Sequence, residues 1–167
     1  MSRHALITGA GTGIGAAIAT QLHGEGHNVA LIGRRLEPLA ALAETLGSAC
    51  VAITGDVTDR ESVEKAFALA TDSFGPVEML INCAGVAPTA PFHRMEFADW
   101  QKTLDVNLNG VFHCTQVALG DMKSASWGRI VTIASTASLR GFAYVSGYCA
   151  SKHAALGLTR ALALETA

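Results

Sequence analysis

The chain has 167 residues and a formal net charge of −2; half of its residues are hydrophobic and only 16% are charged. This length is enough for one domain that buries its own core, and the composition excludes a disordered or fibrous chain. Because no run of Lys or Arg is present, we expect no attraction to nucleic acid or to anionic membranes. The sequence therefore predicts a soluble globular protein whose single domain spans residues 1–167.

The start of the sequence and its cysteines narrow the cellular setting. Residues 1–4 lead into an apolar run at 5–7, which is too short for a signal peptide, and no stretch is apolar enough to cross a membrane. The four cysteines are widely spaced, at Cys50, Cys83, Cys114 and Cys149. This spacing indicates neither a disulfide framework nor a metal site, and the patterns together predict a cytoplasmic protein with core thiols.

Short aliphatic runs alternate along the chain with longer segments of helical periodicity. The predicted strands lie near residues 5–8, 28–33, 50–54, 79–82 and 129–134. They are mostly continuous apolar runs, as expected for strands that helices cover on both faces. The alternation implies repeated β-α-β crossovers, so we predict a three-layer α/β/α fold with a doubly wound, Rossmann-like parallel sheet of about five strands.

End signals place the helices between these strands. Gly26 follows the first helix, Thr58 or Asp59 caps the third, and Gly75 with Pro76 ends it. The last predicted helix, 148–165, reaches almost to the final residue. The fifth strand is then an uncovered sheet edge unless another chain or a further C-terminal segment lies against it.

A glycine-rich turn follows the first strand and opens the first helix. Such a turn lets backbone N–H groups approach a pyrophosphate, which the helix dipole also attracts. The fingerprint G-x-G-x-x-G fails from Gly9, but the looser G-x-G-x-x-A is met by Gly11, Gly13 and Ala16. The alternative is a turn required only for packing. The candidate cofactor-binding residues here are Thr8, Gly9, Gly11, Thr12, Gly13, Ile14 and Gly15.

The end of the second predicted strand bears on the identity of the cofactor. A free ribose 2′-hydroxyl calls for an acidic residue at this place, whereas the sequence has Arg34 and Arg35. Because a guanidinium matches phosphate geometry, the pair favours NADP(H). NAD(H) stays as the alternative, since Glu37 is close by, and the two arginines are otherwise solvated residues before a helix.

Tyr148 and Lys152 open the last predicted helix with a spacing of four residues. This spacing puts the phenol and the ammonium on one helix face, where the cation stabilises the phenolate. Ser135 ends the fifth strand, at the sheet edge where ligands bind, and Ser138 is a nearby competitor for its role. These groups predict general acid catalysis, with a serine donating a hydrogen bond to a substrate oxygen.

In this order and spacing, the motifs resemble the short-chain dehydrogenase/reductase family of the type built on T-G-x-x-x-G-I-G, over the whole chain. Asp56 and Val57 are similar to the family segment whose aspartate meets the adenine ring. The N-C-A-G sequence at 82–85 resembles the family's turn after the fourth strand, in which Asn82 has an architectural role. The resemblance adds to the cofactor-binding candidates Asp56, Val57, Asn82, Ala84, Gly85, Tyr148 and Lys152.

The resemblance also implies a catalytic tetrad of Asn107, Ser135, Tyr148 and Lys152. Asn107 would hold a water that links Lys152 to solvent, and Lys152 would also bind the nicotinamide ribose. The implied activity is the NAD(P)-dependent interconversion of a ketone or 3-oxoacyl group and a secondary alcohol. Small carbonyl or alcohol molecules are the implied substrates, and a homodimer or homotetramer is the implied assembly.

The sequence departs from the family pattern after the last helix. Family members continue into a sixth strand, a substrate-binding loop and a seventh strand, so this chain is C-terminally incomplete by comparison. We favour the interpretation that it is the retained part of a longer enzyme, because the tetrad is unbroken. The alternatives are a truncated or non-catalytic NAD(P)-binding module and a nucleotide-sensing protein without turnover.

Overall fold

The computed structural model describes residues 2–167. The strands are β1 His4–Thr8, β2 Asn28–Gly33, β3 Cys50–Thr54, β4 Met79–Asn82 and β5 Arg129–Thr132. The helices are α1 Gly13–Gly24, α2 Leu36–Leu46, α3 Arg60–Phe74, α4 Phe97–Leu104, α5 Gly110–Ser124 and α6 Ser146–Glu165. A π-helical turn, Asp105–Asn109, joins α4 to α5, and 3-10 turns lie at Phe92–Arg94 and Thr136–Ser138.

All strand pairs in the sheet are parallel, in the order β3-β2-β1-β4-β5. The chain runs outward from β1 to β3 and then returns to the other side of β1 for β4 and β5. The strand order therefore reverses between β1 and β4, where Leu6 of β1 is paired with both Ala30 and Leu80. This reversal confirms the predicted doubly wound fold and places the ligand-binding crevice at the carboxyl ends of β1 and β4.

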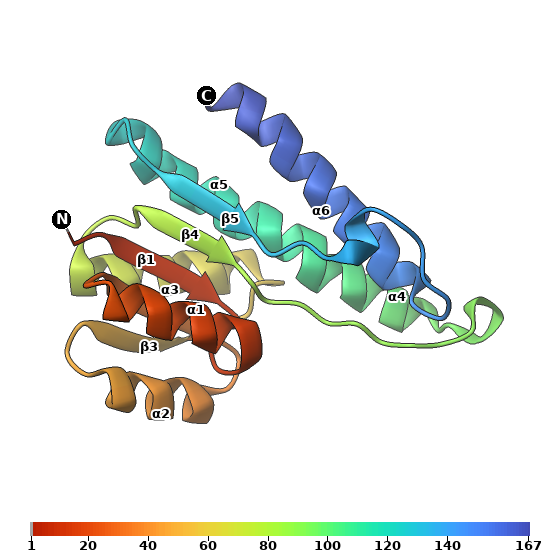
Figure 1. Cartoon of the computed structure of the whole chain (residues 1–167), viewed down its shortest axis with the longest axis horizontal. Helices are drawn as coiled ribbons and strands as arrows, with labels where there is room; N and C mark the ends of the chain where they lie inside the picture. Colours follow the sequence, from red (N-terminus) through yellow and green to blue (C-terminus); the bar gives the residue numbers. More distant parts are fainter. Residues whose placement is uncertain (1) are drawn as a thin grey trace.

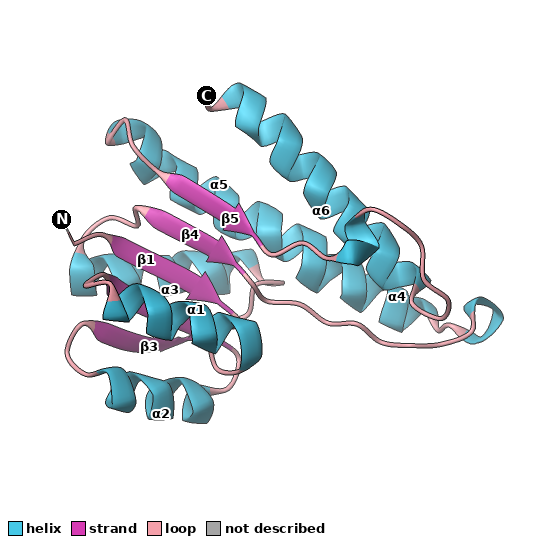
Figure 2. Ribbon diagram, in the orientation of Figure 1, coloured by secondary structure: helices cyan, strands magenta, loops and turns pink. Residues whose placement is uncertain are grey.

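Helices pack against both faces of the sheet, as Figures 1 and 2 show. Neighbouring residues of β1 point to opposite sides: Leu6 packs in a cluster with Phe67 of α3 and Ala118 of α5. Ile7 packs in a second cluster with Ala19 of α1 and Leu39 of α2. This two-sided burial explains why the strands are continuous apolar runs, and it makes the strand ends rigid supports for the loops that follow.

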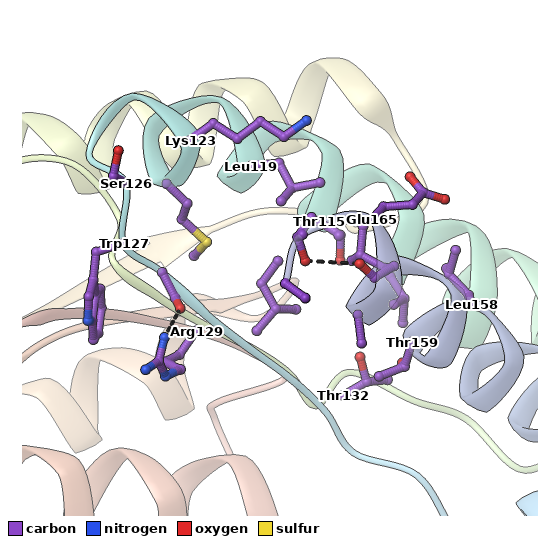
Figure 3. Close-up of a pocket in the computed structure, with 18 residues that line it drawn as sticks. Thr115, Leu119, Lys123, Ser126, Trp127, Arg129, Thr132, Leu158, Thr159 and Glu165 are labelled. Atoms are coloured by element: carbon purple, nitrogen blue, oxygen red, sulfur yellow. Dashed lines mark hydrogen bonds between the residues drawn. The ribbon is translucent and has the colours of Figure 1, made fainter.

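Strand β5 is an open edge of the sheet within residues 2–167. Val131 is 46% exposed, and near the end of α6 Leu164 is 86% exposed. A groove of about 760 Å³ runs between α5, β5 and α6, with Leu119 of α5 and Leu158 of α6 on its walls (Figure 3). In the same residues, no helix combines the length and apolarity that crossing a membrane needs.

Two boundaries of the sequence prediction are corrected, and one open alternative is decided. Strand β5 ends at Thr132 rather than at 134, because the chain then turns toward the 3-10 turn at Thr136–Ser138. Helix α6 begins at Ser146, two residues earlier than predicted. Asp59 and not Thr58 caps α3, since the Thr58 hydroxyl donates to Asp56 while the Asp59 carboxylate accepts from the Glu61 N–H.

All four cysteines are free thiols, and Cys114 and Cys149 are buried, whereas Cys50 and Cys83 are half-buried. Burial raises the pKa of Cys50 to about 11 and that of Cys114 to about 12. A thiol with a raised pKa is a poor nucleophile at neutral pH. These cysteines therefore behave as core residues.

Candidate active site

The glycine-rich turn between β1 and α1 depends on backbone that only glycine adopts easily. Gly9 and Gly13 have positive φ angles of 66° and 57°. A Cβ added at Gly9 would lie 2.8 Å from the Ala84 Cα, and one added at Gly15 would collide with the Gly9 carbonyl oxygen. Thr12, before α1, makes no side-chain capping bond. The N–H groups at the start of α1 are thus free of a side-chain cap and suited to an anion.

Thr8 connects this turn to the end of the neighbouring strand. Its buried Oγ1 accepts hydrogen bonds from the N–H groups of Cys83 at 3.0 Å and Ala84 at 3.1 Å. The residue is therefore a brace between β1 and the N-C-A-G turn after β4. Sequence reasoning placed Thr8 at the cofactor site but did not identify this bracing role, which depends on strands that lie far apart in the chain.

A pocket of about 130 Å³ opens beside the glycine turn, at the carboxyl ends of β1, β2, β3 and β4. Its lining brings together six predicted residues, Gly9, Arg34, Asp56, Val57, Ala84 and Gly85. Arg35 is exposed and does not line the pocket. Val86 and Val106 also line it, and sequence reasoning missed Val106 because a lone valine in a helical segment carries no chemical signal.

The loop after β3 holds Asp56 in place at this pocket. The carboxylate Oδ1 accepts from the N–H of Thr58 at 2.9 Å and from its hydroxyl at 2.8 Å. The backbone N–H of Asp56 donates to the Ser62 Oγ at 3.0 Å. These bonds fix Asp56 where it lines the pocket.

Asn82, at the end of β4, has a structural position. Its buried amide donates from Nδ2 to the Thr115 Oγ1 at 3.1 Å, which ties β4 to α5. Asn82 is absent from the pocket lining. Asn82 thus holds the end of the strand that leads into the turn with Ala84 and Gly85.

Tyr148 and Lys152 lie in the first turns of α6, as their spacing predicts. The Lys152 ammonium is 5.8 Å from the centre of the Tyr148 ring and donates to the Ile133 carbonyl at 2.6 Å. Lys152 is buried and Tyr148 is half-buried. Burial lowers the pKa of Lys152, because removal from water disfavours the charged ammonium.

The first turn of α6 is positioned by residues to which the sequence assigned no role. A Cβ added at Gly147 would lie 3.4 Å from the Trp100 ring and 3.8 Å from the Met95 sulfur. Trp100 belongs to α4, and Met95 lies in the loop before it. Glycine at 147 thus lets the first turn of α6 pack closely against Trp100, and the absent side chain is the only sign of this contact in the sequence.

Asn107 lies fully buried in the π-helical turn between α4 and α5. Its Oδ1 accepts from the Val86 N–H at 2.8 Å, and its Nδ2 donates to the Val86 carbonyl at 2.9 Å and to the Ser151 Oγ at 3.0 Å. Ser151 in turn donates to the Tyr148 carbonyl at 2.8 Å. Asn107 therefore joins the pocket wall at Val86 to the helix that carries Tyr148.

The Asn107 Oδ1 and the Lys152 Nζ both lie close to Gly85. A Cβ added there would lie 3.4 Å from the Asn107 Oδ1 and 3.9 Å from the Lys152 Nζ. Both of the amide protons of Asn107 already have protein acceptors. A water between Asn107 and Lys152 would accordingly be bound through an oxygen of Asn107.

Ser135 and Ser138 occupy different environments after β5. Ser135 is half-buried with its backbone extended, and its Oγ accepts from the Ala137 N–H at 3.1 Å. Ser138 is 3% exposed, and its Oγ accepts from the Ser135 N–H at 3.1 Å. Only Ser135 of the two is accessible to a substrate.

Comparison with known proteins agrees with this architecture. A family model described as short chain dehydrogenase matches residues 3–167. The sequence is 39% identical over 166 residues to glycine betaine reductase ATRR of Emericella nidulans, covering 98% of this chain and 13% of that protein. It is 39% identical over 164 residues to D-threitol dehydrogenase of Mycolicibacterium smegmatis, covering 96% of this chain and 63% of that protein.

A solved structure gives the same result. A short-chain dehydrogenase from Streptomyces avermitilis superposes with a TM-score of 0.94 at 30% identity, covering 99% of this chain and 60% of that one. The chain thus spans less than two thirds of the length of these proteins. Its five-stranded sheet, its glycine turn and the family match over nearly every residue agree, and the chain belongs to the short-chain dehydrogenase family.

Proposed function

We propose that this chain carries the cofactor-binding and catalytic residues of an NAD(P)-dependent oxidoreductase that interconverts a ketone or 3-oxoacyl group and a secondary alcohol. The observation that carries the proposal is the placement of Tyr148 and Lys152 on one face of α6, beside a glycine turn suited to a pyrophosphate. Membership of an oxidoreductase family agrees with it. Because the relatives are longer, the substrate of the whole protein is part of the proposal.

The residues present fit a dinucleotide. A Cβ at Gly9 or Gly15 would collide with neighbouring backbone, so the close packing of this turn requires glycine at both positions, and the start of α1 has no side-chain cap. The pyrophosphate would lie on the turn Gly9–Gly15, and the adenosine half would enter the pocket that Asp56 and Val57 line. When bound, the nicotinamide supplies or accepts the hydride.

The chain's own groups supply the proton and hold the oxygen. During reduction Tyr148 would donate its phenolic proton to the substrate oxygen, and during oxidation it would take that proton back. Ser135 donates a hydrogen bond to the same oxygen, which stabilises the charge that develops there. Lys152 holds its ammonium beside the phenol and favours the phenolate form.

Arg34 supports a preference for NADP(H). Its side chain lines the pocket on the side of β2, where a 2′-phosphate would lie, and Arg35 is adjacent but outside the pocket. We therefore propose NADP(H) as the preferred cofactor and assign the phosphate contact to Arg34. A lower KM for NADPH than for NADH is the expected result, and a marked preference for NADH would overturn the assignment.

Tyrosine replacement separates catalysis from simple nucleotide binding. Tyr148→Phe is expected to abolish oxidation of NADPH by ketones while leaving its binding measurable by nucleotide fluorescence. The matched control is Tyr144→Phe, which removes a hydroxyl from an exposed tyrosine four residues earlier. If Tyr148→Phe retained the rate of the control, Tyr148 would not be the proton donor, whereas a chain that binds NADPH and reduces no ketone in either variant would be a nucleotide-binding module.

We also propose that the protein is a cytoplasmic homodimer or homotetramer. Helix α5, which follows the turn bearing Asn107, leaves Phe112 47% exposed, and such a side chain is suited to an interface. Light scattering tests the assembly, and a monomer at micromolar concentration would exclude it.

A further inference from the structure

A second serine lies in the 3-10 turn after β5, three residues beyond Ser135. Ser138 is 3% exposed, so its hydroxyl does not reach the site where a substrate would bind. Both polar backbone groups of Ser135 are bonded to it. The Ser135 N–H donates to the Ser138 Oγ at 3.1 Å, and the Ser138 N–H donates to the Ser135 carbonyl at 2.9 Å.

These two bonds hold the backbone of Ser135 from both sides, and a third bond fixes its side chain. The Ser135 Oγ accepts from the Ala137 N–H at 3.1 Å, which completes a reciprocal capping box around the turn. A hydroxyl has one proton to donate and two lone pairs. With one lone pair committed to Ala137, the proton of Ser135 is directed away from that N–H.

We propose that Ser138 is a positioning residue, which sets the direction in which Ser135 donates its hydrogen bond to the substrate oxygen. The inference rests on the proposed role of Ser135 and assigns Ser138 no contact with the substrate. A hydrogen bond aimed at a developing charge loses strength quickly with misalignment, because its energy falls steeply at poor angles. Loss of the Ser138 hydroxyl would free the Ser135 backbone and weaken that bond.

A purely structural role for Ser138 predicts a different outcome. Removing a capping hydroxyl lowers the stability of a turn without changing the chemical step. Asp59 offers a matched control, since its carboxylate caps α3 through the Glu61 N–H, away from Ser135. Asp59→Ala therefore measures the effect of losing a cap alone.

The test is a double-mutant cycle in the full-length protein, with NADPH and the ketones ethyl acetoacetate, 2,3-butanedione and acetophenone. Ser138→Ala is expected to lower kcat about tenfold, which is less than the loss expected from removing the Ser135 hydroxyl itself. Its Kd for NADPH is expected to stay within about twofold of that of the unmodified protein. In a Ser135→Ala background, Ser138→Ala is expected to change kcat by less than about twofold. Asp59→Ala is expected to keep kcat.

Two results would overturn the inference. One is a kcat for Ser138→Ala that equals that of Asp59→Ala. The other is that Ser138→Ala lowers kcat by the same factor in the unmodified protein and in the Ser135→Ala background. If the unmodified protein reduced none of the ketones, the proposed function would fail, and amide hydrogen exchange would decide this inference separately. Ser138→Ala is expected to speed exchange of the Ser135 amide at least about tenfold, because that N–H loses its acceptor. Unchanged exchange would show that Ser138 does not hold the backbone of Ser135.

Discussion

Replacing Thr8 by valine tests the brace between the glycine turn and strand β4. Valine keeps the shape of the side chain but replaces the hydroxyl oxygen by a methyl group, so the N–H groups of Cys83 and Ala84 lose their acceptor. Leaving a buried donor unpaired costs about 1–3 kcal/mol, and two such donors therefore cost about 2–6 kcal/mol. Both residues are half-buried, which favours the lower part of this range.

The expected loss is large enough to measure by thermal unfolding. For a chain of this size each kcal/mol lowers Tm by about 2–4 °C, so Thr8→Val is expected to lower Tm by about 5–15 °C. Thr8→Ser keeps the acceptor oxygen and is the matched control, with a loss of about 1 kcal/mol for the missing methyl group. Scanning calorimetry of the three proteins at one pH and salt concentration gives the comparison.

The same variant is expected to weaken cofactor binding. Ala84 lines the pocket beside the glycine turn and lies against Gly9, so a shift of the turn after β4 moves both residues. Fluorescence titration with NADPH is expected to give a higher Kd for Thr8→Val than for Thr8→Ser. The reasoning is refuted if the valine and serine variants have the same Tm within 2 °C, roughly the shift from half a kcal/mol.

Three further changes have defined expected outcomes. Gly9→Ala forces a Cβ to 2.8 Å from the Ala84 Cα at a φ of 66°, so we expect a lower Tm and weaker NADPH binding, whereas Gly24→Ala, whose Cβ meets nothing within 4 Å, keeps both. Arg34→Ala is expected to raise the KM for NADPH at least about tenfold and to leave that for NADH nearly unchanged; equal effects on the two cofactors would contradict a phosphate contact. Burial is the largest influence on His4 and lowers its pKa below 6.5, which outweighs the opposite effects of its bonds to the 75–76 backbone and of Glu78. The stability due to neutral His4 is therefore present above pH 6.5 and is lost as the pH falls toward the lower folded-state pKa. The Tm of His4→Asn is expected to decrease less between pH 7 and 5 than the Tm of the unmodified protein.

The fold was predictable from the sequence because strands that are buried on both faces are continuous apolar runs. Strands β2, β3 and β4 begin and end at the predicted residues, since each is a short apolar run between polar or glycine-containing turns. The end of β5 was predicted two residues too late, because Ile133 and Ala134 extend the apolar run beyond the last paired residue. Apolarity marks what can be buried, whereas pairing depends on where the neighbouring strand ends.

The candidate site was predictable only where residue type and position identify a role together. The glycines of the turn and the pair Tyr148 and Lys152 are of this kind, because few residues can replace them in those roles. The hydrogen bonds that Thr8 and Ser138 accept could not be predicted in this way. Threonine and serine occur throughout proteins, and their bonding partners depend on tertiary contacts. The competition between Ser135 and Ser138 was therefore open until their exposure was known.

Asn107 shows how such contacts join the two halves of the site. The chain turns at Asp105–Asn109 through a π-helical segment, and this turn lets one side chain reach both Val86 and Ser151. Val86 lines the pocket beside the glycine turn, and Ser151 donates to the carbonyl of Tyr148. One buried amide thus joins the pocket wall to the helix that carries Tyr148 and Lys152. This connection depends on the π-helical turn, and such turns frequently occur at functional sites.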